Sequence, residues 1–158
     1  GVYKNSANWA GYSRVAVQNH LICDALDCYC TCPNWCYLAA HSAGCMIVVQ
    51  WAQKYSRRDI FGALLAAPAD VESPMPAGYP SVDQLAAAGW TPIPLRPLPF
   101  PSVVAASTND PLCSFARAEG FARNWGSRFL DVGAVGHINP AAGFGEWKLG
   151  EDLIRVMI

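Results

Sequence analysis

The chain has 158 residues, of which 53% are hydrophobic and 15% charged, so we expect one packed domain over residues 1–158 rather than a disordered chain. The formal net charge of −1 provides no basic field. Neither nucleic acid nor a membrane surface is therefore an expected partner. No apolar run reaches the roughly 20 residues that a membrane-spanning helix needs. No secretory signal pattern opens the sequence.

Seven cysteines are present, and five of them lie between residues 23 and 36. Such a cluster is typical of a metal site or of disulfides. The spacing does not give two separated CxxC pairs, and an odd number does not give a complete set of disulfides. We therefore expect reduced thiols, many of them buried, no cofactor, and a cytoplasmic protein. Metal binding through Cys28, Cys30, Cys32 and Cys36 is the alternative.

Strand-like apolar runs alternate with helical periodicities, which predicts an α/β fold with a mostly parallel sheet covered by helices. We predict strands over residues 35–40, 60–67, 102–107 and 128–132. Helices are predicted over 43–55, 82–88, 115–125 and 147–158. Residues 68–101 carry most of the twelve prolines and predict a surface excursion, which either shapes a substrate pocket or is only a long connection. Residues 1–34 predict only a short strand at 15–17 and a helix at 21–29.

The run Ala40-His41-Ser42-Ala43-Gly44 lies between the first predicted strand and the first predicted helix. A strand-to-helix turn of this kind can expose a nucleophilic serine, with small residues two positions before and two after it. The helix N-terminus then directs its positive end toward a developing oxyanion, and the Ala43 N–H is the natural donor. A serine before a helix is also a common N-cap, so the run alone leaves both interpretations open.

A serine nucleophile needs a base, and the chain has three histidines. His20 lies in the least readable part of the chain. His41 adjoins Ser42, but an elbow directs the side chain of this neighbour away from the serine. His137 lies in a glycine-rich loop just after the fourth predicted strand, and we therefore favour it as the base.

The base in turn needs a carboxylate partner. Asp110 follows the third predicted strand, and the order Ser42, Asp110, His137 is the one expected on this type of fold. The carboxyl ends of parallel strands meet at one edge, so the three side chains are expected to converge there. Asp110 also fits a simple turn in Asn109-Asp110-Pro111. Asp70, after the second predicted strand, is the less favoured competitor.

Four segments together resemble the small serine hydrolases of the retinoblastoma-binding-protein-9 and YdeN type. They are residues 100–111, 125–127, 136–139 and 143–147, and Ala40-His41-Ser42-Ala43-Gly44-Cys45 resembles the elbow that precedes them in that family. The resemblance implies a compact three-layer α/β-hydrolase-like sandwich. It also implies a catalytic serine, acid and base at Ser42, Asp110 and His137. The retinoblastoma-binding motif of the vertebrate members is absent, so no such partner is expected.

The resemblance weakens at the N-terminus, where family members have a buried strand and a turn that supplies a second oxyanion donor. We expect that strand to be missing here, with the chain incomplete or its N-terminal sequence unreliable, and we place the second donor near Tyr3 or Asn5. The sequence thus predicts an esterase-type serine hydrolase that acts on a small acyl substrate. The alternative is an interaction protein on a hydrolase scaffold with little or no catalytic activity.

Overall fold

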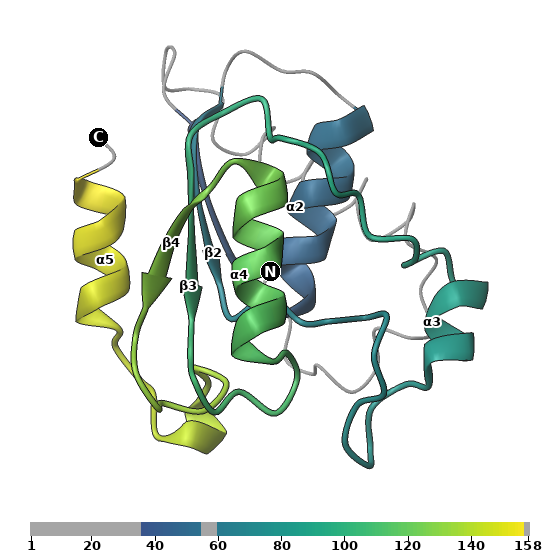
Figure 1. Ribbon diagram of the computed structural model, residues 1–158. Helices are drawn as coiled ribbons and strands as arrows, with labels where there is room; N and C mark the ends of the chain where they lie inside the picture. The colour runs from purple at the N-terminus through teal and green to yellow at the C-terminus, as the bar shows by residue number, and fades with distance from the viewer. Residues whose placement is uncertain (1–35, 55–59, 157–158) are drawn as a thin grey trace.

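The computed structural model describes residues 36–54 and 60–156, and its centre is a parallel sheet (Figure 1). The strands of this described part are β1 (Cys36–His41), β2 (Ile60–Ala66), β3 (Ser102–Ala106) and β4 (Arg128–Asp131). They pair in chain order, and every pairing is parallel. The four predicted strands are confirmed to within about one residue at each end. The strand and helix predicted before residue 35 lie outside the described residues.

Helices lie on both faces of this sheet, as the predicted three-layer sandwich requires (Figure 1). The described α-helices are α2 (Ala43–Lys54), α3 (Val82–Ala87), α4 (Phe115–Trp125) and α5 (Lys148–Arg155). α2 and α4 cover one face, and α5 covers the other. All four predicted helices are confirmed, and the last of them ends at Arg155. Parallel strands need a crossover between them, so the segments that contain α2, α3 and α4 each return the chain to the edge at which the next strand begins.

The strands divide their side chains between the two faces with a period of two. In β3, Val104 and Ala106 belong to the larger core under α2 and α4, whereas Val103 and Ala105 belong to a smaller core with Leu153 of α5. Burial on both faces explains why β2 and β3 read as nearly continuous apolar runs in the sequence.

Short polar signals set the helix boundaries. Ser81 caps α3 in a capping box with Gln84: the Ser81 hydroxyl accepts from the Gln84 N–H, and the Gln84 side chain accepts from the Ser81 N–H. Ser114 caps the start of α4, and Gly126 ends that helix in the left-handed conformation. These caps bring the chain out of α4 directly into β4, which begins at Arg128.

The proline-rich segment 68–101 is less superficial than the sequence predicts, because several of its side chains enter the larger core. Trp90 and Leu85 are completely buried, and Ile93 is nearly so. Helix side chains also fasten its backbone: Gln50 donates to the Trp90 carbonyl at 2.6 Å, and the Trp125 indole donates to the Pro94 carbonyl at 2.8 Å. Side chains of α2 and α4 thus donate to backbone carbonyls of this segment that lie outside helices and strands. Among the described residues, no helix is both long and apolar enough to cross a bilayer.

Two helical glycines differ in the space around them. At Gly150 in α5, a Cβ atom would come within 3.0 Å of three atoms of the Trp147 ring, which packs against the smaller core. At Gly120 in α4, a Cβ atom would meet nothing within 4 Å. Alanine normally stabilises a helix interior relative to glycine, but at Gly150 it displaces the indole.

We therefore expect opposite signs for the two alanine substitutions. Gly150→Ala should lower the free energy of unfolding by about 1–3 kcal/mol because the indole leaves its packing site. Gly120→Ala should raise it by about 0.5–1 kcal/mol. Urea unfolding followed by far-ultraviolet circular dichroism measures both. Equal effects of the same sign would contradict the packing of Trp147 on Gly150.

Candidate active site

Ser42 forms the whole connection between β1, which ends at His41, and α2, which begins at Ala43. Its φ of 57° lies in the left-handed region, which costs a non-glycine residue about 1–2 kcal/mol. Neighbouring backbone stabilises this turn: the Ser42 N–H donates to the Ala66 carbonyl at 3.1 Å, and the Ser42 carbonyl accepts from Cys45 N–H at 3.0 Å. The turn thus has the strained geometry that the elbow pattern predicts.

Small residues face each other across this turn. A Cβ atom at Gly44 would lie 3.9 Å from the Ala40 Cβ, which is ordinary van der Waals contact. The alanine at position 40 therefore fits where the usual pattern has glycine, and the strand and helix approach closely at this point.

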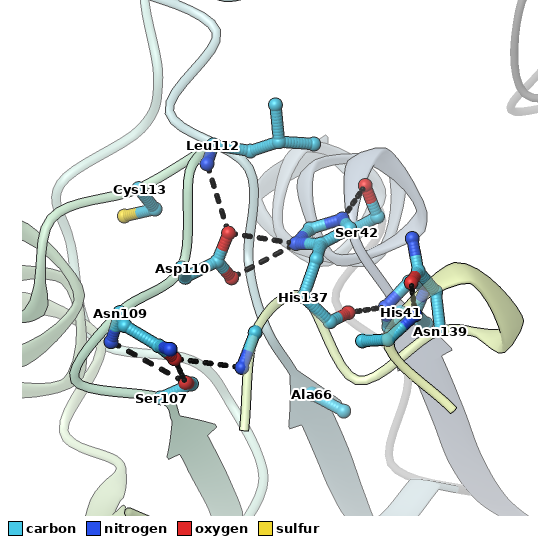
Figure 2. A network of polar contacts seen from close by, with 12 residues as sticks. His41, Ser42, Ala66, Ser107, Asn109, Asp110, Leu112, Cys113, His137 and Asn139 are labelled. Carbon is cyan, nitrogen blue, oxygen red and sulfur yellow. Dashed lines mark hydrogen bonds and ion pairs between the residues drawn. The ribbon is translucent and has the colours of Figure 1, made fainter. Parts of the chain in front are cut away.

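The side chains of Ser42, His137 and Asp110 form a continuous hydrogen-bonded row (Figure 2). His137 Nε2 lies 2.8 Å from Ser42 Oγ, and His137 Nδ1 lies 2.9 and 2.8 Å from the two Asp110 carboxylate oxygens. An ionised carboxylate only accepts, so Nδ1 carries the proton and Nε2 is free to accept from the serine hydroxyl. The side chains of His137 and Asp110 are only 6% and 3% exposed, which shields this row from water.

The carboxylate of Asp110 is itself held in place, because Oδ1 accepts from the Leu112 N–H at 2.8 Å. Asp70, its competitor in the sequence, lies elsewhere and is committed to other partners. Asp70 Oδ2 lies 3.2 Å from Arg117 Nε and accepts from Ser73 Oγ at 2.6 Å. The structure therefore brings Asp110, and not Asp70, against His137.

The loop that carries His137 is fastened to the loop that carries Asp110. Asn109 Oδ1 accepts from the Gly136 N–H at 2.7 Å, and Ser107 Oγ accepts from the Val135 N–H at 3.0 Å. The Ser107 hydroxyl donates to Asn109 Oδ1, which joins the two tethers. Sequence reasoning treated this polar run only as a turn and missed its role. The signal in the sequence is the polar run Ser107-Thr108-Asn109, which directly follows the buried strand β3.

Of the two predicted oxyanion donors, one lies in the described part. Ala43 is the first residue of α2, and N–H groups of a first helical turn have no partner within the helix. Its N–H directly follows Ser42 in the chain, which is where an oxyanion on an attacked carbonyl would form. Tyr3 and Asn5 lie outside the described residues, as does His20.

The two cysteines with described side chains are buried free thiols. Cys45, in the first turn of α2, donates to the carbonyls of Ala40 and Ala66. Burial raises the pKa of Cys45 strongly and raises that of Cys113 to about 12, with nearby carboxylates adding to the effect at Cys113. Neither thiol is thus an available nucleophile, although both lie near Ser42 or Asp110.

Cys28, Cys30 and Cys32 lie outside the described residues, where metal binding stays a prediction. The residues described hold no group of three or more metal-ligating side chains.

The elbow, the hydrogen-bonded row and the parallel sheet together define an α/β hydrolase. The family model for serine hydrolases matches residues 22–156, and the chain belongs to that family. A protein from Pectobacterium atrosepticum described as a YdeN-like hydrolase is 31% identical, with a TM-score of 0.67 over 89% of this chain and 71% of that one. The expected resemblance is thereby confirmed.

More distant structures share the fold alone. Est1E from Butyrivibrio proteoclasticus is 10% identical, with a TM-score of 0.67 over 99% of this chain and 84% of that one. A Bacillus cereus carboxylesterase is 19% identical, with a TM-score of 0.53 over 90% and 60% of the two chains. The comparison with curated proteins gives no match.

The raised thiol pKa values lead to a prediction about alkylation. Because thiolate is the reactive form, native Cys45 and Cys113 should resist iodoacetamide at pH 8.5, and both should react once guanidinium unfolds the chain. Peptide mass spectrometry follows each cysteine separately, so the remaining five do not interfere. Rapid modification of Cys113 in the folded protein would contradict its burial beside Asp110.

Proposed function

We propose that this chain is a carboxylic ester hydrolase that works through an acyl-enzyme on Ser42. The observation that carries the proposal is the hydrogen-bonded row from Ser42 Oγ through the His137 ring to the Asp110 carboxylate. A histidine with one nitrogen on a buried carboxylate and the other on the serine of a strand-to-helix turn has the geometry of general-base activation. The proposal rests on this arrangement together with membership of the serine hydrolase family.

Acylation begins when His137 Nε2 accepts the hydroxyl proton of Ser42 while Oγ attacks the ester carbonyl carbon. The carbonyl π electrons move to oxygen, and the Ala43 N–H donates to the resulting oxyanion. The imidazolium is stabilised by Asp110 across the 2.8 Å contact at Nδ1. Collapse of the tetrahedral intermediate breaks the bond to the alcohol, which leaves with the proton from Nε2.

Deacylation repeats these steps with water. His137 Nε2 removes a proton from water, and the hydroxide oxygen attacks the acyl carbon. The second tetrahedral intermediate collapses with cleavage of its bond to Ser42 Oγ, which takes the proton back from His137 Nε2 as the carboxylic acid leaves. The short row of three side chains serves both half-reactions, because His137 alternates between base and acid at Nε2 while Nδ1 stays on Asp110.

Two observations support esters as the substrate class. Structures that share this fold include an esterase domain from Rhodothermus marinus and the Bacillus cereus carboxylesterase. The apolar, proline-rich residues that follow β2 run from the edge at which Ser42 lies, which suits an uncharged acyl substrate. The free thiols at Cys45 and Cys113 are consistent with a reducing compartment, so we also propose a cytoplasmic location.

The proposal predicts Ser42-dependent covalent labelling. Wild-type protein should react with a fluorophosphonate probe, and Ser42→Ala should abolish the label, since no other described serine hydroxyl is hydrogen-bonded to a histidine. Hydrolysis of p-nitrophenyl acetate should fall about 10⁴-fold in Ser42→Ala, Asp110→Asn and His137→Gln.

Circular dichroism spectra of the three variants serve as the control for folding. Wild-type protein that takes up no label and hydrolyses no short-chain ester would overturn the proposal. That result would favour the interaction protein on a hydrolase scaffold.

A further inference from the structure

His41, the last residue of β1, reaches the loop of the proposed base rather than the serine next to it (Figure 2). Its Nε2 lies 2.7 Å from the backbone carbonyl oxygen of His137. The two imidazole rings also lie against each other, with centroids 4.7 Å apart and planes tilted by 54°. The last residue of β1, His41, thus contacts the loop of His137, and Ser42 follows it directly in the chain.

The partner atom fixes the hydrogen on this ring. A carbonyl oxygen only accepts, so His41 Nε2 carries the proton and donates. Desolvation of the ring lowers the pKa of His41, although part of the residue remains exposed. The bond to the carbonyl and the Asp110 carboxylate raise this pKa, whereas the neighbouring His137 lowers it. A neutral His41 ring suits this position, because an imidazolium forms on His137 during the proposed reaction.

The loop that His41 contacts has left-handed backbone on both sides of His137, which glycine adopts freely at Gly136 and which is strained at Ile138. Gly136 has a φ of 66°, and Ile138 has a φ of 48°, which is unusual for a β-branched side chain. Such a backbone keeps its conformation only when surrounding contacts hold it. Asn109 holds the loop before His137 through the Gly136 N–H, and His41 holds it at the carbonyl of His137 itself.

We propose that His41 is a positioning residue that holds the His137 carbonyl, so that Nε2 of His137 stays within hydrogen-bond reach of Ser42 Oγ. This inference rests on the proposed function for its kinetic consequences. It also predicts the position of the His137 ring independently of any activity. The hydrogen bond and the ring contact of His41 are both made to His137, so its effect passes through the base.

Two substitutions separate the hydrogen bond from the bulk of the ring. His41→Gln keeps a neutral N–H donor at about the reach of Nε2, whereas His41→Leu keeps similar volume without a donor. We expect kcat for p-nitrophenyl acetate to fall about ten-fold in His41→Leu with KM nearly unchanged, about the effect of one lost hydrogen bond. His41→Gln should stay within about three-fold of wild type. The rate of fluorophosphonate labelling should follow kcat.

Proton NMR supplies a readout that does not require turnover. The Nδ1–H of His137, bonded to Asp110, should give a far down-field resonance in wild type and in His41→Gln. In His41→Leu that resonance should broaden or disappear, while the thermal midpoint shows that the protein remains folded.

Equal behaviour of the Leu and Gln variants, in kinetics and in the NMR signal, would overturn the inference. So would a rise in KM with constant kcat. An NMR effect in a protein that takes up no label would instead retain the positioning of His137 and remove the proposed function.

Discussion

The register of the parallel sheet places the carboxyl ends of all four described strands at one edge. Ser42 follows β1, Asp110 follows β3 and His137 follows β4, so three segments far apart in the chain meet there. Without parallel pairing, residues 95 positions apart would have no common edge on which to make a 2.8 Å contact. The hydrogen bonds at the site therefore depend on strand order, which the helices on both faces maintain.

Strain at this edge is matched by specific contacts. Within residues 36–54 and 60–156, two of the three non-glycine residues with positive φ, Ser42 and Ile138, flank the point where the proposed nucleophile meets the proposed base. Backbone bonds to Ala66 and Cys45 stabilise the turn at Ser42, and side chains of Asn109 and His41 hold the loop around His137. A serine and a histidine kept in these conformations lose little further freedom when a substrate binds, which is how a preorganised site lowers a barrier.

A second polar cluster lies beside the loop that carries Asp110. Arg117 of α4 pairs with Asp70 and Glu72, and the Glu72 carboxylate accepts from the Ile93 N–H at 2.8 Å. The Asp70 N–H in turn donates to the Leu112 carbonyl, two residues beyond Asp110. This cluster connects the segment after β2, the proline-rich residues and the loop of Asp110. The buried charge in this cluster, on Asp70, is paired with Arg117, as burial requires.

The sequence by itself determined the strands, the helices and the residues able to act as nucleophile, acid and base. These follow from local patterns: runs buried on both faces, 3.6-residue periodicity, and reactive side chains just after strand ends. Only the tertiary structure decided which side chains make contact. In the folded chain, Asp70 pairs with Arg117 and Asp110 with His137. His41 contacts the carbonyl of His137, and Trp90 of the proline-rich segment is buried. Such pairings depend on how separate segments approach in space, and local sequence carries no measure of that approach.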